Sequence, residues 1–208
     1  MENILVLSKY ICDKYREETT QIIDEMKLHK LLYFTQREAL IQTDMPLFSE
    51  IFEAWKYGPV CIEVRTAYNH QLLEKDMIDE TPSKLAKQLA NDMINKYGYK
   101  NSWSLSRLTH CEISWINARV GIPEGHNGNN LIQLEDIRID AEKIKLRRVH
   151  LKDKKDNVEN NYNSGYVVEL REEEYEALFD EEVEIINIPK KIKELEKRLR
   201  KSGIKLIR

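Results

Sequence analysis

The stretch that decides the fold is DEMKLHKLLYFTQREALIQ, residues 24–42. Its apolar residues recur at helical spacing and cover more than half of the circumference of the helix that they predict. A helix that is apolar over so wide an arc is typical of a protein interior, so we expect this one to be central and the most buried. Asp24 and Glu25 favour a helix start here because they complement the positive end of the helix dipole.

Further helices are predicted on both sides of this segment. Residues 4–15 have the spacing of an amphipathic helix. Residues 81–98 predict another, with Thr81 as its N-cap, Pro82 in its first turn and Gly98 at its end. Its expected buried stripe comprises Leu85, Leu89, Met93 and Tyr97.

The segment NSWSLSRLTHCEISWINARVG, residues 101–121, predicts two short helices. Ser102 or Ser104 would cap the first of them, Ser114 would cap the second, and Gly121 would stop it. The composition of IPEGHNGNN indicates a loop, and LIQLEDIRIDAEKIKL predicts a further helix, although its alternation leaves a strand possible.

A short extended segment is predicted between the central helix and the next one. IFEAW, residues 51–55, is rich in β-branched and aromatic residues and favours a strand. Gly58 permits a turn, and Pro59 suits the first turn of a helix that runs through Val60 and Val64.

The composition indicates a folded, mostly helical protein. Of the 208 residues, 41% are hydrophobic and 33% charged, and the 7 glycines and 5 prolines are few for an all-β sandwich. No apolar run reaches the roughly 18 residues that span a bilayer, and the N-terminus makes a poor signal peptide. The 3 cysteines are scattered, so we expect a cytoplasmic protein without disulfides. The net charge of -3 gives no overall attraction to nucleic acid or to an acidic membrane.

The predicted fold class is mainly α: a compact helical domain with one or two short strands, followed by a small charged α+β extension. We place the domain at residues 1–150 and the extension at 151–208, where it would either pack on the domain or stand apart from it. Residues 151–165 predict a polar linker or a hairpin loop, and YVVEL a strand. The extension continues with an acidic stretch at 172–184 and a basic helix at 190–201, which would pair with each other or meet a partner.

No catalytic, cofactor or metal site is predicted. Neighbouring His110, Cys111 and Glu112 point in different directions on a helix and lack a second cluster, so a metal site is not expected. His110 and Glu112 are expected instead to tie two helices together through hydrogen bonds. Cys61 and Cys111 lie in no motif that orients a base, and EGHNGNN lacks the ending of a phosphate-binding loop. We therefore predict a protein that is not an enzyme.

Three segments in order resemble the signature blocks of one family. These are KLHKLLYFTQREAL at 27–40, EAWKYGPVCIEV at 53–64 and SLSRLTHCEISWINAR at 104–119. They are similar to the Panacea domain, the SocA-type antitoxin family of bacteria and their phages. The resemblance covers roughly residues 5 to 145. It departs from the family at two positions, where the family usually has Gln in place of His29 and Pro in place of Ser114.

The resemblance implies a helical domain that binds and neutralises a protein toxin, which an adjacent gene would encode. It also leaves open a protease adaptor that delivers the toxin for degradation, and a nucleic-acid-binding regulator acting through the basic helix at 190–201. Nucleic acid is the less favoured partner because no helix-turn-helix or zinc-finger pattern is visible. A hydrolase would rest only on isolated Cys and His residues.

A partner-binding surface is predicted around EAWKYGPV. In one interpretation Trp55 and Tyr57 are core anchors; in the other, Lys56 and Tyr57 line a groove that grips an extended segment of a partner. Both hold if Trp55 points inward and Lys56 outward, and a free edge of the strand would then accept a partner strand. The predicted site residues are Trp55, Lys56, Tyr57, Gly58, Pro59, His110 and Trp115.

Overall fold

The computed structural model describes residues 1–73, 78–123 and 125–158, with side chains up to residue 146. Within these residues it contains seven helices and one two-stranded antiparallel hairpin. The chain divides into two units, residues 1–147 and 148–208. The elements are α1 (Ile4–Thr19), α2 (Glu25–Thr43), β1 (Glu53–Trp55), β2 (Gly58–Val60), α3 (Ile62–Asn69), α4 (Lys84–Tyr97), α5 (Ser102–His110), α6 (Ile113–Ala118) and α7 (Leu134–Val158).

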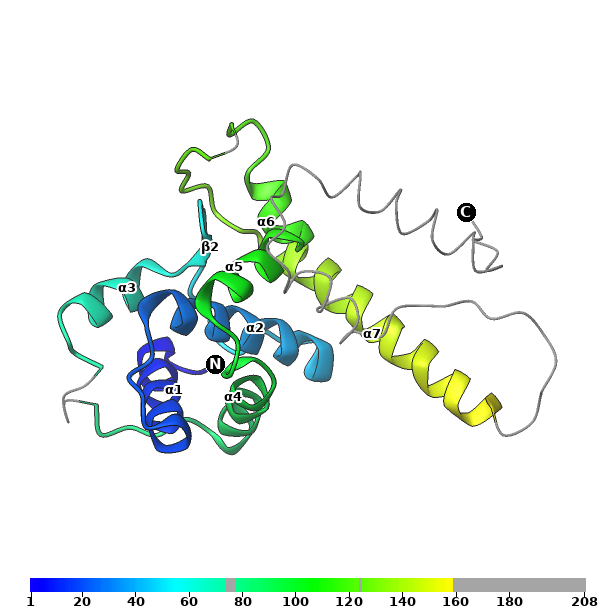
Figure 1. Cartoon of the computed structure of the whole chain (residues 1–208), viewed down its shortest axis with the longest axis horizontal. Coiled ribbons are helices and arrows are strands. Elements are labelled where there is room, and N and C mark those ends of the chain that lie inside the picture. Colours follow the sequence, from blue (N-terminus) through cyan, green and yellow to red (C-terminus); the bar gives the residue numbers. More distant parts are fainter. Residues whose placement is uncertain (74–77, 124, 159–208) are drawn as a thin grey trace. The chain divides into compact units, whose positions relative to one another are not determined.

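The central helix is the one that the sequence predicts. α2 is buried around its whole circumference from Lys27 to Ile41. It begins after Asp24, whose side chain accepts a hydrogen bond from the Lys27 backbone N–H at 2.9 Å, and it ends at Asp44 in a left-handed conformation. Helices α1, α4 and α5 pack against α2, and Figure 1 shows it passing between them. The prediction of a mainly helical fold is confirmed.

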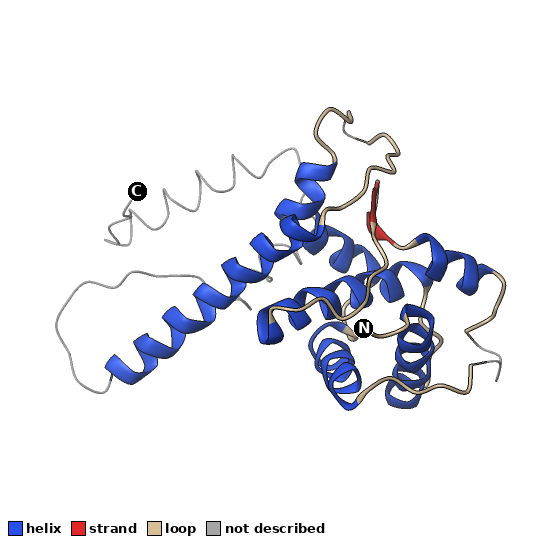
Figure 2. Ribbon diagram, turned by 180° about the vertical axis from the view of Figure 1, so that it is seen from behind, coloured by secondary structure: helices blue, strands red, loops and turns tan. Residues whose placement is uncertain are grey.

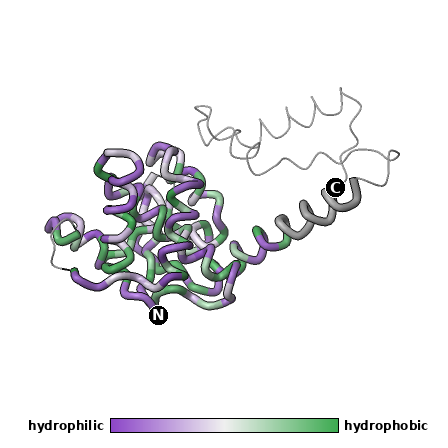
Figure 3. The backbone as a smooth tube through the Cα atoms, turned by 90° about the horizontal axis from the view of Figure 1, so that it is seen from below, coloured by the Kyte–Doolittle hydropathy of each residue, from purple (hydrophilic) through white to green (hydrophobic). Residues whose placement is uncertain are grey.

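Apolar burial follows the helical pattern of the sequence. Figure 3 shows hydrophobic and hydrophilic residues interleaved along the tube of the first unit, as amphipathic helices require. Tyr33, Phe34 and Phe52 lie in edge-on contact at the centre, with ring centroids 5.7 Å apart in each pair that includes Tyr33. The core therefore depends on aromatic residues of α2 and of the segment before β1.

The predicted start of α4 is wrong by two residues. α4 begins at Lys84 and is capped by Ser83, whose hydroxyl accepts from the Ala86 N–H at 3.2 Å, so neither Thr81 nor Pro82 has the predicted role. This shift turns Leu85 outward, with 41% of its surface exposed, and places Ala86 in the core. The remaining predicted stripe residues, Leu89, Met93 and Tyr97, are buried, and Gly98 follows the helix as expected.

Helices α5 and α6 form where the sequence predicts two short helices, but their caps differ. Asn101 caps α5 through a hydrogen bond from the Ser104 N–H at 2.7 Å, so Ser102 and Ser104 lie inside the helix. Ser114 also lies inside its helix, because α6 begins at Ile113 after Glu112.

The chain after Phe52 forms a tight hairpin. β1 pairs with β2 in antiparallel register, with Glu53 opposite Val60 and Trp55 opposite Gly58. Figure 2 shows this strand segment leading directly into α3. The predicted strand at 51–55 is confirmed for its last three residues. Pro59 lies in β2 rather than in the first turn of a helix, and α3 begins only at Ile62.

Both edges of β1 are occupied. One edge pairs with β2, while on the other the Ala54 N–H donates to the Asn130 carbonyl and the Ile132 N–H to the Phe52 carbonyl, each at 2.8 Å. Leu131 forms an antiparallel bridge with Glu53. The predicted free edge of IFEAW is therefore wrong, because a loop about 80 residues later in the sequence covers it.

The last described element is α7. It runs without a break through Val158, so IRIDAEKIKL is helical rather than a strand, and residues 151–158 belong to a helix instead of a linker or loop. The predicted strand YVVEL, the acidic stretch and the basic helix at 190–201 lie outside the described residues. Among the helices that the structure describes, none is long and apolar enough to cross a membrane.

Candidate functional site

An exposed aromatic pair stands on the surface between the hairpin and α5. Tyr57, in the turn between β1 and β2, is 42% exposed, and Trp103 of α5 is 58% exposed. Their rings meet edge to face, with centroids 5.0 Å apart. The Lys56 ammonium lies 5.1 Å from the centre of the Tyr57 ring. Tyr57 is thus a surface residue, and its interpretation as a core anchor is wrong.

Trp55 faces away from the core. The buried residue of β1 is Ala54, and alternate strand residues point to opposite faces, so Trp55 shares its face with Glu53. The indole N–H of Trp55 donates to the Glu53 carboxylate at 2.7 Å, and the Arg65 guanidinium lies 4.9 Å from the Trp55 ring centre. The indole is half-buried by these neighbours, and the prediction that Trp55 points inward is wrong.

A second aromatic stack joins α5 and α6 to the hairpin. The ring of His110 stacks on Trp115 with centroids 3.9 Å apart and planes 14° apart, and the Arg119 guanidinium lies 5.0 Å from the Trp115 ring centre. The Trp115 indole N–H donates to the Trp55 carbonyl at 3.0 Å. Burial, together with the charges of Lys30 and Arg119, lowers the pKa of His110 to about 4, so the stacked imidazole is neutral at pH 7.

The turn at Gly58 and Pro59 rests on a buried lysine. The Lys30 side chain of α2 is 1% exposed and donates to the Pro59 carbonyl at 3.0 Å. Burial lowers the pKa of Lys30 to about 7, although Asp24 and Glu25 act in the opposite direction. Gly58 has a φ of 99°, and a Cβ at this position would collide with Thr109 and Lys30. The sequence therefore has glycine here for both conformation and space.

Beneath these aromatic groups lies a buried ionic contact. Arg37 of α2 pairs with Glu112, and its guanidinium also donates to the Tyr97 hydroxyl at 3.4 Å. The prediction that His110 and Glu112 together tie helices is wrong in its pairing: Glu112 bonds to α2 through Arg37, while His110 stacks on Trp115.

The two positions that depart from the family pattern are both buried. His29 accepts a hydrogen bond at Nδ1 from the Cys61 N–H at 3.4 Å, and burial lowers its pKa. The Ser114 hydroxyl lies 2.7 Å from the Tyr33 hydroxyl, and the Ser114 N–H donates to the Asp140 carboxylate at 2.9 Å. Ser114 and Nδ1 of His29 therefore have local partners, while the buried Nε2 of His29 lies 3.7 Å from a Glu25 carboxylate oxygen, beyond hydrogen-bond distance.

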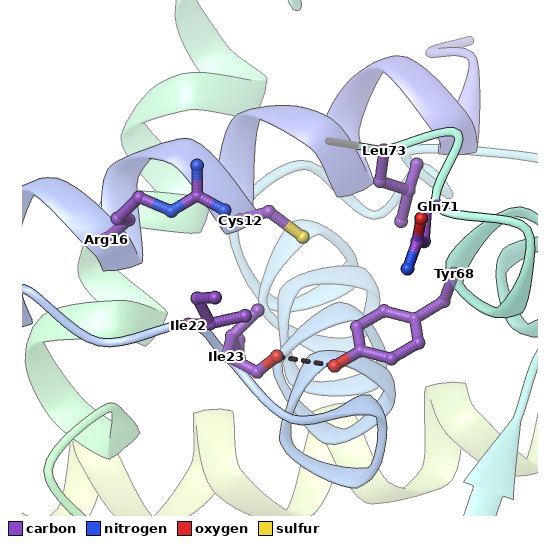
Figure 4. A pocket seen from close by; sticks show the side chains of 7 residues that line it. All are labelled: Cys12, Arg16, Ile22, Ile23, Tyr68, Gln71 and Leu73. Atoms are coloured by element: carbon purple, nitrogen blue, oxygen red, sulfur yellow. Dashed lines mark hydrogen bonds between the residues drawn. The ribbon is translucent and has the colours of Figure 1, made fainter. Parts of the chain in front are cut away.

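The cysteines and the metal-ligand residue types singled out in the sequence can be located in the described part of the chain. It contains no group of three or more His, Cys, Asp or Glu that could hold a metal ion. Burial raises the pKa of the Cys61 thiol, and this disfavours its nucleophilic thiolate form. Cys111 is exposed, and the neighbouring Glu112 carboxylate acts to raise the pKa of its thiol. The small cavity in Figure 4, beside Cys12 and Tyr68, has a volume of about 10 Å³ and is no larger than one water molecule.

The structure brings the seven predicted site residues into one region, but sequence reasoning missed three of their neighbours. Trp103 lies seven residues before His110 on α5, which is two helical turns, so helical periodicity carried a signal for it. No sequence signal pointed to Arg65 or Arg119, because their positions over the indole rings follow from tertiary packing.

Comparison with known proteins connects this region with one family. No curated protein and no solved structure matches the chain. The family model described as antitoxin SocA-like, Panacea domain, matches residues 28–116. This span is narrower than the resemblance at 5–145 and runs from α2 into α6, so it contains all seven predicted site residues.

Proposed function

We propose that this protein, which carries a SocA-like Panacea domain over residues 28–116, is an antitoxin that binds a protein toxin directly and neutralises it. The toxin would be the product of an adjacent gene, and both proteins would act in the cytoplasm. The proposal concerns binding and not catalysis, in keeping with the buried Cys61 thiol, whose pKa is raised by burial.

The observation that carries the proposal is the exposed pair of Tyr57 and Trp103. Large aromatic side chains in contact with each other yet open to solvent are characteristic of protein interfaces, where they contribute most of the binding energy. The ammonium of Lys56 beside the Tyr57 ring adds a charged rim to this pair. Together, Lys56, Tyr57 and Trp103 form what we call the aromatic surface.

The aromatic surface is held by buried contacts. The Ser106 hydroxyl donates to the Tyr57 carbonyl at 3.0 Å, and Lys30 donates to the Pro59 carbonyl on the other side of Gly58. The hairpin turn is thereby fixed to both α5 and α2. A surface that is already ordered loses less conformational entropy on binding, and this favours affinity for a folded partner.

Co-expression with the product of the neighbouring gene tests the proposal. We expect the full chain to restore growth to cells that express the toxin and to retain it in a pull-down. The double variant Tyr57→Ala, Trp103→Ala should lose both effects while keeping its thermal stability. Met45→Ala is the matched control. Met45 is also exposed, at 65%, but it follows the C-terminal end of α2, whereas Lys30, which supports the hairpin turn, lies nearer the N-terminal end. Failure of the full chain to bind or rescue with either adjacent gene would contradict the proposal.

The half-life of the toxin separates direct neutralisation from delivery to a protease. Under direct neutralisation, rescue persists in a host that lacks the energy-dependent proteases, and the toxin accumulates in complex with the chain. If rescue required a protease and toxin levels fell only when it was present, the protein would be an adaptor instead.

A further inference from the structure

The segment that covers β1 has an open outer edge of its own. Successive residues of a strand direct their backbone N–H and C=O groups to opposite edges. The Asn130 carbonyl and the Ile132 N–H both bond to β1, so the N–H and carbonyl of Leu131 face away from the hairpin. Leu131 is 50% exposed, and no partner for its N–H is found within the described residues.

A shallow groove with both polar and apolar lining runs along this edge. It is open to solvent, has a volume of about 560 Å³, and lies between the end of α6 and the start of α7. Four side-chain amides line it beside Leu131, contributed by Asn117, Asn129, Asn130 and Gln133. Such amides carry both donors and acceptors, the same groups that a peptide backbone presents.

Existing hydrogen bonds hold the side-chain amides of the groove in place but leave some of their donors and acceptors unused. Asn117 Nδ2 donates to Asp136 at 2.9 Å, and Asn130 Nδ2 donates to the Ala118 carbonyl at 2.8 Å. Gln133 Nε2 lies 3.4 Å from the Leu131 carbonyl, a long contact that a better donor would replace. Within the described part of the chain, the Asn129 amide makes no side-chain hydrogen bond.

We infer that this edge binds an extended peptide segment of a partner protein, which adds a strand beside residues 129–131. The inference deepens the proposed function and rests on it for the identity of the partner, the toxin. The Leu131 N–H would donate to a carbonyl of the incoming strand, and the side-chain amides would bond to the groups on either side of it. The neutral amides favour recognition of backbone over recognition of a charged side chain, since the one carboxylate lining the groove, that of Asp136, already accepts from Asn117.

Amide hydrogen exchange at two neighbouring residues tests the inference without any mutation. In the free chain, the Ile132 N–H should be protected by its bond to Phe52, whereas the Leu131 N–H should exchange rapidly. Short linear peptides selected from a random library on the full chain serve as the probe, so the test does not depend on the toxin. Bound peptides should slow exchange at Leu131 and leave Ile132 unchanged. Selection of peptides that never protect Leu131, or of none, would overturn the inference.

Measuring toxin binding by variants of Leu131 then tests this inference separately from the proposed function. Leu131→Pro removes the outward N–H and keeps the bonds of Asn130 and Ile132 to β1. We expect it to weaken toxin binding about tenfold, because one buried acceptor of the partner loses its donor. Leu131→Val keeps the N–H and should bind as the wild type does. Toxin binding that is unaffected by Leu131→Pro, with Leu131 still exchanging rapidly in the complex, would refute the edge and leave the antitoxin function intact.

Two controls complete the test: the thermal stability of Leu131→Pro, and the dependence of Leu131 N–H exchange on the concentration of the chain. If Leu131→Pro proves unstable, protection of Leu131 in the unmodified complex decides the question. Protection of Leu131 in the isolated chain that grows with its concentration would identify a second copy as the occupant, and would overturn the assignment to a different partner protein.

Discussion

The carboxylate of Asp140 lies at the start of α6, where its Oδ2 accepts a hydrogen bond from the Ser114 N–H at 2.9 Å. Its other oxygen accepts from the Ile113 N–H at 2.8 Å. The first N–H groups of a helix have no partner within that helix, and α6 lacks a side-chain cap from Glu112. A residue of α7, outside the matched family span, therefore caps a helix that begins within that span.

Replacing Asp140 should loosen α6. Asp140→Ala leaves two backbone N–H groups without an acceptor, so we expect a loss of about 2–3 kcal/mol in the free energy of unfolding. Asp140→Asn retains an acceptor oxygen and should lose less. Denaturant unfolding measures both, and Glu135→Ala, on the exposed side of α7, is the control that should change little. Equal stability of Asp140→Ala and the control would contradict the capping role.

The buried Lys30 should make stability depend on alkaline pH. With its pKa lowered to about 7 in the folded state and near 10.5 when unfolded, Lys30 is protonated in the unfolded chain and neutral in the folded chain between these values. Unfolding then takes up a proton, so this lysine makes the protein more stable as pH rises from 7 to 10, by up to about 1.4 kcal/mol per pH unit.

The difference between two variants isolates this effect from other titrations. Thiols such as Cys61, whose pKa is raised by burial, act in the opposite direction above pH 9. Lys30→Met should remove only the contribution of Lys30, so its stability relative to the wild type should fall as pH rises. Lys84→Met, at an exposed lysine, should show no such trend. A constant difference between Lys30→Met and wild type from pH 6 to 10 would be inconsistent with a lowered pKa.

Comparing alanine substitutions at two glycines distinguishes the cost of a positive φ from the cost of a steric clash. Gly58 and Gly121 both have positive φ, at 99° and 83°, but only at Gly58 would an added Cβ meet other atoms. We expect Gly121→Ala to cost about 1 kcal/mol and Gly58→Ala about 3 kcal/mol or more. Thermal unfolding of the two variants gives the difference, which measures how closely Thr109 and Lys30 support the hairpin turn. Similar losses of stability in both variants would show that Thr109 and Lys30 move aside to accept the added Cβ at residue 58.

Local pattern sufficed for the helices but not for the hairpin. The apolar arc of residues 24–42 covers more than half of the helix and therefore predicts a central helix, although the burial of its charged residues goes beyond that pattern. Thr81 and Ser83 are both competent N-caps, and only the packing of Ala86 in place of Leu85 selects Ser83. By its sequence, Pro59 is compatible with either a helix start or a strand, and its pairing with β1 places it in a strand.

The candidate site required contacts that no local pattern contains. The seven predicted site residues do gather in one region, because two family blocks carry them. The outward direction of Trp55 follows from the burial of Ala54, and Asn130 and Ile132 close the edge of β1 from a distant loop. The burial of Lys30 was equally hidden, since a lysine on a predicted helix is usually exposed.

Trp55 offers a direct test of which way β1 faces. An indole in the core would cost about 3–5 kcal/mol on truncation to alanine, and we expect this loss for Phe52→Ala, whose ring is 2% exposed. Trp55 lies on the outer face and loses a contact with Arg65 and a hydrogen bond to Glu53, so Trp55→Ala should cost only about 1–2 kcal/mol. Urea unfolding of the two variants makes the comparison. If Trp55→Ala were as damaging as Phe52→Ala, the assigned orientation of β1 would be wrong, and with it the exposure of the hairpin turn that the aromatic surface requires.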